Sequence, residues 1–242
     1  FPLYLIKKNP TLDMITYVDS DTWFLSNPEI IFNDIGGASV AITPHRFSPE
    51  RRDLVRYGRF NVGWITWRND AEGRRCLEDY RADCLEWCYD IPEENRFADQ
   101  KYLDKWPGLY PSLKSLDHPG VNVAAWNINN YNISDVDGIL FFGDKRIVFW
   151  HYHGLKELSD GTWSHSFDSQ ILSGHPFLLD RICRPYIRRL MVADQTLKVR
   201  YGLERDIKVH IRYSADRPAA TDSDPTPTPA SPSPPSPPSG SA

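Results

Sequence analysis

The chain has 242 residues, of which 40% are hydrophobic and 25% are charged, as in ordinary globular proteins. This composition excludes disorder of the whole chain and predicts one large domain or two small ones. The formal net charge of -4 gives no electrostatic reason to expect a nucleic-acid partner. The longest apolar runs are too short to span a membrane.

The composition changes sharply near residue 214. Nine of the 20 prolines lie between Pro218 and Pro238, whereas no aromatic residue lies beyond Tyr213. Residues 214–242 are mostly Pro, Ser, Thr and Ala, which cannot bury enough apolar area to offset the entropy lost on ordering. We therefore predict a disordered tail over 214–242, behind a body that carries the core.

The body reads as short strands mixed with helices, which favours an α/β fold with a late antiparallel hairpin. Strands are predicted over Met14–Val18, Ser39–Thr43, Asn61–Arg68, Val121–Ile128, Ile139–Phe142 and Arg146–Trp150. Helices are predicted over Phe1–Lys8, from an Asp70 cap to about residue 88, over Phe97–Trp106 and over Phe177–Met191.

Four cysteines are too few for a small disulfide framework, which favours a reducing, cytoplasmic compartment. The predicted helix over 177–191 has Pro185 in its middle and carries four arginines opposite apolar residues. Its basic face is expected to be solvated. The alternative is peripheral contact with an anionic inner membrane surface.

Two aspartates stand directly after the first predicted strand. Asp19 and Asp21 are separated by one residue, so both carboxylates can converge on one hard cation such as Mg²⁺ or Mn²⁺. The alternative is a solvated turn in which the aspartate side chains cap nearby backbone groups. Phosphatases of the haloacid dehalogenase type also begin with Asp-x-Asp, but Trp23 stands where they need Thr or Val.

Further polar residues follow later strands. His151 and His153 would point to one face of a strand and could each ligate a metal, although one packed and one exposed histidine is the alternative. Gly154 permits close approach of a ligand, and Lys156 offers a cation for phosphate.

Two further pairs of residues are candidates. Asn61 and Gly63 could bind a sugar hydroxyl close to the backbone; the alternative is a strand with a bulge at Gly63. Asp99 and Gln100 stand together at a predicted helix start.

The order of these motifs resembles the nucleotide-sugar glycosyltransferases of the GT-A fold, most nearly family 8. The resemblance covers about Phe1 to Lys156. The motifs that carry it are Tyr17-Val18-Asp19-Ser20-Asp21, Asn61-Val62-Gly63, Asp99-Gln100 and His151-Tyr152-His153-Gly154-Leu155-Lys156. It implies a mixed, Rossmann-like sheet flanked by helices, and transfer of a sugar from a nucleoside diphosphate donor to a glycan or glycolipid acceptor.

The resemblance also implies roles for single residues. Asp19, Asp21 and His151 correspond to the ligands of Mn²⁺ or Mg²⁺, with His153 as the alternative ligand. Asn61, Gly63, Gly154 and Lys156 correspond to donor-binding residues, and Asp99 and Gln100 to the catalytic pair near the sugar. Lys156 comes five residues after His151 instead of the usual six.

Only about a dozen residues precede the Asp-x-Asp strand, whereas the family has further strands there. We therefore expect a GT-A domain over 1–176 that lacks its first strands, so that the chain is a truncated fragment and a poor enzyme alone. A helical extension over 177–213 would follow. A carbohydrate-binding module without catalysis, suggested by the eight tryptophans, is the alternative from another class.

Overall fold

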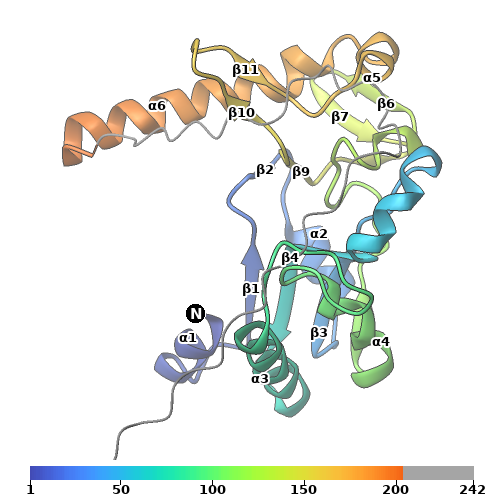
Figure 1. Cartoon of the computed structure of the whole chain (residues 1–242), viewed down its shortest axis with the longest axis vertical. Helices are drawn as coiled ribbons and strands as arrows, with labels where there is room; N and C mark the ends of the chain where they lie inside the picture. Colours follow the sequence, from blue (N-terminus) through green and yellow to red (C-terminus); the bar gives the residue numbers. More distant parts are fainter. Residues whose placement is uncertain (204–242) are drawn as a thin grey trace, which may run out of the picture. The chain divides into compact units, whose positions relative to one another are not determined.

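A four-stranded mixed sheet forms the centre of the computed structural model, which describes residues 1–203 (Figure 1). The strand order is β1-β4-β3-β5, and only β3 and β5 run parallel to each other. The bounds are Met14–Val18 for β1, Val40–Pro44 for β3, Phe60–Arg68 for β4 and Leu113–Ser115 for β5. The mixed α/β architecture expected from the sequence is therefore confirmed.

Strand β4 is the central strand that positions the site. Eight of its nine residues are buried, because apolar layers cover both faces of the sheet. Its pairing with β3 shifts register between Ile42 and Thr43, which confirms the bulge anticipated around Gly63. The bulge interrupts the regular ladder where β4 passes the end of β1.

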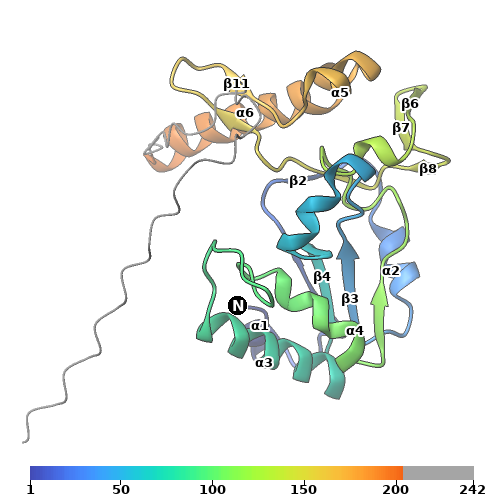
Figure 2. The same ribbon diagram turned by 45° about the vertical axis from the view of Figure 1, so that its right-hand side comes forward.

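Helices pack on both faces of this sheet (Figure 2). On one face, α1 (Pro2–Lys8) and α3 (Ala71–Glu86) contribute Ile6, Cys76 and Leu77 to a core that also contains Trp67. On the other face, α2 (Glu29–Ile35) packs Ile31 and Ile35 against Trp64 and Phe149 of a second core. Each helix buries one apolar stripe against the strands.

A third core joins the later part of the described chain and contains Trp150, Phe167 and Ile182. Its strands are β2 (Thr22–Phe24) paired with β9 (Phe149–His151), and a separate sheet of β6 (Ile133–Val136), β7 (Ile139–Phe142) and β8 (Lys145–Arg146). A short hairpin of β10 (Lys156–Glu157) and β11 (Trp163–Ser164) follows. The helical elements are α5 (Ser169–Gly174), η4 (Leu179–Cys183) and α6 (Arg184–Tyr201).

Short 3₁₀ elements complete the order. They are η1 (Pro49–Tyr57), η2 (Lys101–Lys105) and η3 (Ile128–Asn130), and α4 (Trp106–Leu109) follows η2 directly. Among the described residues, no helix is long and apolar enough to cross a membrane.

Several predicted elements differ from the structure. Residues 121–128 form no strand: only Val123 bridges to Trp150, and side-chain amides bond much of this segment instead. The helix predicted over Phe97–Trp106 is a turn followed by η2, and α4 continues through Pro107 because proline fits a first helical turn. The second hairpin strand breaks after Arg146, since β9 pairs with β2.

The helix predicted over 177–191 begins as a π-helical turn and extends to Tyr201 as α6. Pro185 lies in the first turn of α6 instead of mid-helix, so it interrupts no α-helical hydrogen bond there. The predicted tail over 214–242 and the end of the 177–213 extension lie outside the described residues.

The cap of α3 provides a test of this framework. Asp70 accepts hydrogen bonds from Gly73 N at 2.8 Å and from the buried Ser39 hydroxyl at 2.7 Å. We expect Asp70→Ala to lower the free energy of unfolding in urea by about 1–2 kcal/mol. Asp70→Asn, which keeps an acceptor for Gly73, should lose less. Equal losses for the two variants would contradict a capping role.

Candidate metal centre

The two aspartates of the Asp-x-Asp motif lie in the tight connection between β1 and β2. Backbone bonds fix its ends, because Asp19 N donates to Gly63 O at 3.3 Å and Tyr152 N donates to Asp21 O at 2.7 Å. The Thr22 hydroxyl donates to Asp19 O at 2.8 Å. The connection therefore holds both carboxylates at the end of the central sheet.

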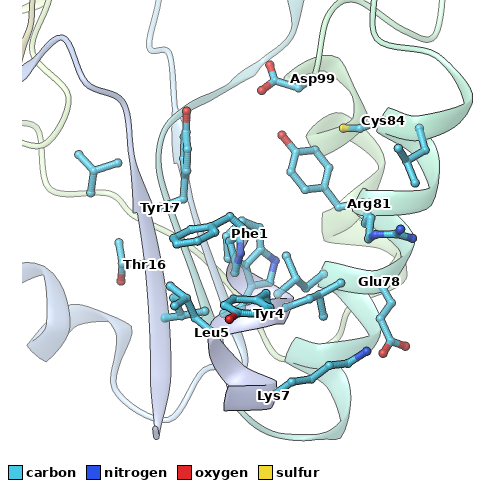
Figure 3. Close-up of a pocket in the computed structure, with 18 of the residues that line it drawn as sticks. Phe1, Tyr4, Leu5, Lys7, Thr16, Tyr17, Glu78, Arg81, Cys84 and Asp99 are labelled. Carbon is cyan, nitrogen blue, oxygen red and sulfur yellow. The ribbon is translucent and has the colours of Figure 1, made fainter. Parts of the chain in front are cut away.

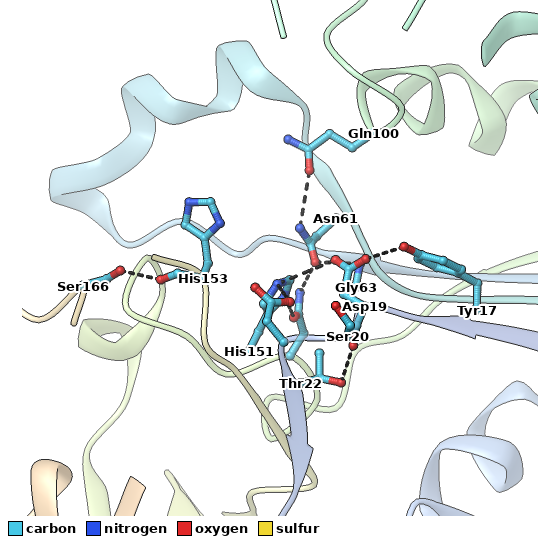
Figure 4. A network of polar contacts seen from close by, with 12 residues as sticks. Tyr17, Asp19, Ser20, Thr22, Asn61, Gly63, Gln100, His151, His153 and Ser166 are labelled. Carbon is cyan, nitrogen blue, oxygen red and sulfur yellow. Dashed lines mark hydrogen bonds and ion pairs between the residues drawn. The ribbon is translucent and has the colours of Figure 1, made fainter. Parts of the chain in front are cut away.

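His151 reaches these carboxylates from β9. The antiparallel pairing sets His151 opposite Thr22, immediately after the aspartates. His151 Nε2 lies 3.0 Å from Asp21 Oδ1 and 3.7 Å from Asp19 Oδ2 (Figure 4). One ligand atom from each of the three residues lies within 4.8 Å of the others. The structure thus brings together the three ligands that the sequence predicted.

The centre is closed on the histidine side and open on the carboxylate side. The side chain of His151 is 4% exposed, that of Asp19 20% and that of Asp21 44%. Burial acts to raise the pKa of Asp21, but the hydrogen bond and charge of His151 outweigh it and hold that pKa below its usual value. Asp21 can therefore serve as an anionic ligand at neutral pH.

Tyr17 contacts Asp19 and lies beside an apolar groove. Its hydroxyl donates to Asp19 Oδ1 at 2.8 Å. Burial, followed by this hydrogen bond, raises the pKa of Tyr17, so the hydroxyl stays a donor. Tyr17 also lies at the upper end of an apolar groove of about 1140 Å³ between α1, β1 and α3, where Asp99 is found (Figure 3).

Asp99 is outside the three-residue cluster but is affected by it. Burial raises the pKa of the Asp99 carboxyl, and the charge of Asp19 raises it further, while a hydrogen bond from Tyr80 opposes the shift. Its neighbour Gln100 points the other way: Gln100 Nε2 donates to Tyr57 O at 2.9 Å, and Oε1 faces Asn61 Nδ2 at 3.4 Å. The two residues of the predicted catalytic pair thus have different surroundings.

His153 is not part of the cluster in the described residues, although its ring lies 6.4 Å from that of His151 between centroids. Burial and the charge of His151 lower the pKa of His153. Gly154 has φ +80°, and an added Cβ would lie 2.3 Å from Ser166 Oγ, so glycine is required there. Lys156 is exposed at the start of β10.

Behind His151 lie further polar residues, of which the sequence analysis singled out only Asn61. His151 Nδ1 lies 3.0 Å from Asn122 Oδ1, and Asn122 Nδ2 donates to Asn61 Oδ1 at 3.1 Å. Asn61 Nδ2 lies 3.2 Å from Nε2 of the buried His45. The available signal was an asparagine in an apolar stretch, Val121-Asn122-Val123, that we interpreted as a strand.

Comparison with known proteins gives relatives of unestablished function. No family model matches the chain. Two uncharacterized proteins of Bacillus subtilis (strain 168) are similar: YfnF is 33% identical over 169 residues, covering 65% of this chain and 56% of YfnF. YfnD is 31% identical over 158 residues, covering 64% of this chain and 51% of YfnD. The chain thus spans about half the length of the curated relatives it matches.

Among solved structures, the glycosyltransferase GlyE of Streptococcus pneumoniae TIGR4 is similar with a TM-score of 0.31 and 24% identity. The match covers 48% of this chain and 26% of GlyE.

Gly63 tests how tightly the centre is packed. An added Cβ would lie 2.5 Å from Asn61 Oδ1 and 2.8 Å from His151 Nδ1. We expect Gly63→Ala to destabilise the protein by about 1–3 kcal/mol in urea unfolding, because both side chains must move. Gly108→Ala, where an added Cβ meets nothing within 4 Å, is the matched control. Equal effects of the two substitutions would contradict the packing described.

Asp99 gives a pH-dependent prediction. Because its pKa is raised in the folded chain, the folded state binds the proton more tightly than the unfolded state, so this contribution to stability falls as pH rises above the ordinary value of about 3.9. In chelator-containing buffer, we expect Asp99→Asn to be more stable than the wild type at pH 7. The difference should vanish at acidic pH, where both side chains are neutral. A stability gain that is independent of pH would contradict this.

Proposed function

We propose that the chain is part of a metal-dependent glycosyltransferase that moves a sugar from a nucleoside diphosphate donor to a glycan or glycolipid acceptor. The observation that supports this most is the convergence of His151 on Asp19 and Asp21, from which it is far apart in sequence. They were identified through the order of motifs in the GT-A glycosyltransferases of family 8. The fold proposed is accordingly a GT-A-like sheet.

The residues fit a divalent cation. Two carboxylates and one imidazole form a donor set that Mn²⁺ accepts, and Mg²⁺ would rely on the carboxylates. His151 Nδ1 is held by Asn122, which leaves Nε2 directed at the two aspartates. When bound, such an ion would neutralise diphosphate charge and so stabilise the leaving group.

The chain's own residues would bind and orient the donor around this centre. Asp21, the most exposed of the three, lies where a diphosphate would enter. Asp99 is half-buried, close enough for the charge of Asp19 to raise its pKa, and is proposed to face the sugar or the attacking hydroxyl. Gly154 and Lys156 come three and five residues after His151 and are proposed to contact the donor's phosphates.

The alternative of a carbohydrate-binding module receives less support. Such modules present aromatic rings to sugars at their surface. Here Trp64, Trp67, Trp106 and Trp150 are at most 2% exposed, and none of the eight tryptophans is an exposed residue. Those four pack within the cores instead. The phosphatase alternative still lacks the Thr or Val that it needs at position 23. That position is Trp23, which packs edge-on against Tyr186.

Nucleotide binding tests the proposal. We expect calorimetry to detect binding of UDP or GDP in the presence of Mn²⁺ and none after chelation with EDTA. Asp21→Asn removes an anionic ligand and should weaken Mn²⁺-dependent nucleotide binding by at least about 100-fold, the upper end of the loss seen for residues that only orient a ligand. Asp53→Asn, an exposed aspartate of η1, is the matched control.

The same titration separates the alternatives. Glycan binding that needs neither metal nor nucleotide would favour the binding module. Nucleotide binding that Asp21→Asn leaves unchanged would contradict the proposed metal centre.

A further inference from the structure

Tyr152 links two of the predicted metal ligands to a later part of the chain. It follows His151 directly, and its backbone N–H donates to Asp21 O at 2.7 Å. Its side chain is buried in the third core, where the hydroxyl donates to Ile182 O of η4 at 3.1 Å. Tyr152 therefore bonds to the metal centre with its backbone and to η4 with its side chain.

Tyr186 of α6 packs against the same point. Its ring is stacked on that of Tyr152, with 3.9 Å between the centroids and 12° between the planes. It also meets Trp23 edge-on, with 5.6 Å between the centroids. The Tyr186 hydroxyl faces Ser20 O at 3.5 Å, which is long for a hydrogen bond, so the ring contacts carry most of the interaction. Asp21 thus lies in a turn that Tyr186 contacts both before and after it.

The start of α6 and the preceding η4 hold this helix to the rest of the protein. Ile182, Cys183 and Tyr186 are at most 7% exposed and belong to the third core. Of residues 191–201, all are exposed except Asp194, which is half-buried. The helix lies beyond the end of the central sheet, on the side of β2 and β9 (Figure 1). Docking of α6 therefore depends on a few residues, and among them Ile182 and Tyr186 contact Tyr152.

We propose that Tyr152 and Tyr186 are positioning residues that clamp the turn carrying Asp19 and Asp21, so that docking of η4 and α6 sets where Asp21 stands relative to His151. Any effect on a bound cation rests on the proposed function. The clamp itself does not, because every contact that forms it lies within the chain. Both η4 and α6 follow the predicted domain boundary at residue 176, and the clamp makes them part of the support of the site.

Asp21 is the ligand that needs such support. Its side chain is 44% exposed, against 4% for His151, so packing around the carboxylate itself contributes little. Its place is set by the backbone of the short connection between β1 and β2. Residues that orient a metal ligand from behind typically contribute about 10–100-fold to metal affinity. We place the clamp at the lower end of that range, because it acts on the backbone of Asp21 and not on its carboxylate.

Hydrogen exchange of the Tyr152 amide tests the clamp in the metal-free protein. Labelling with ¹⁵N-tyrosine isolates the tyrosine amides in nuclear magnetic resonance spectra, and Tyr152→Phe assigns the signal. Tyr186→Leu removes the stacked ring, so the bond from Tyr152 N to Asp21 O should open locally. We expect exchange of this amide to become at least about 10-fold faster than the loss of global stability, measured in urea, explains.

Phe142→Leu is the matched control. Phe142 is 1% exposed in the same core, and the substitution again replaces a buried ring with leucine, but Phe142 lies in β7 and packs edge-on against Tyr131. Its effect on the Tyr152 amide should be no larger than its effect on global stability. Equal local opening in the two variants would overturn the proposal, and so would a Tyr186→Leu protein without local opening.

Mn²⁺ titration by calorimetry tests the consequence for the metal centre. We expect Tyr186→Leu to weaken Mn²⁺ binding about 10-fold. Tyr186→Phe keeps the stacked ring and should retain the wild-type affinity, as should Phe142→Leu. Wild-type affinity in Tyr186→Leu would overturn the proposal.

The wild-type protein gives a further readout that needs no variant to fold. Coupling between two sites is reciprocal, so a cation that binds better when α6 is docked must stabilise that docking. We expect Mn²⁺ to slow hydrogen–deuterium exchange, measured by mass spectrometry, more in peptides covering 179–190 than in peptides covering β7. Equal slowing in both, or none in 179–190 although Mn²⁺ binds, would overturn the proposal.

These outcomes are separable from those of the proposed function. A wild-type protein that binds neither Mn²⁺ nor nucleotide, together with local opening in Tyr186→Leu, would contradict the transferase and leave the clamp intact. Metal-dependent nucleotide binding together with unaltered exchange of the Tyr152 amide in Tyr186→Leu would do the reverse.

Discussion

The pairing of β2 with β9 is the contact on which both the packing and the site depend. It joins Thr22–Phe24 to Phe149–His151, more than a hundred residues apart, and sets His151 opposite Thr22. Side chains alternate along a strand, so Phe149 enters the core that contains Trp64, whereas Trp150 enters the core that contains Phe167. A slip of one residue would exchange these faces and turn His151 away from the aspartates.

The polar residues behind this strand depend on one another for hydrogen-bond partners. His45, Asn61, Asn122 and His151 are each at most 6% exposed, and a buried polar group that loses its partner costs about 1–3 kcal/mol. Each amide end faces a group of the opposite kind, which offsets that cost. The close approach also explains the glycine at position 63, because a larger residue there would displace two members of the set.

The parts predicted well from the sequence are those set by local chemistry. The strands at Met14–Val18 and 61–68 and the helix after Asp70 follow from apolar runs and a capping side chain, which act within a few residues. The stretch 121–128 was predicted wrongly. Its apolar residues suit a strand, but only Val123 forms a bridge, and the Asn127 side chain bonds Ala124 N and Asn122 O. The convergence of His151 on the aspartates was expected only from the family resemblance. Asn122 could not be found, since its role comes from partners distant in sequence.

The uneven burial of the centre bears on what kind of ion site it is. A cation that stabilises a fold is usually enclosed by protein ligands, whereas one that holds a substrate keeps positions for water or phosphate oxygens. Here the imidazole side is sealed by the asparagines, while nearly half of the Asp21 side chain is exposed. Three protein donors would leave an ion accessible from the Asp21 side. In the proposed site the imidazole is thus the buried ligand, and the exposed Asp21 carboxylate would be where an anionic substrate meets the ion. This asymmetry favours the proposed substrate-binding centre over a structural one.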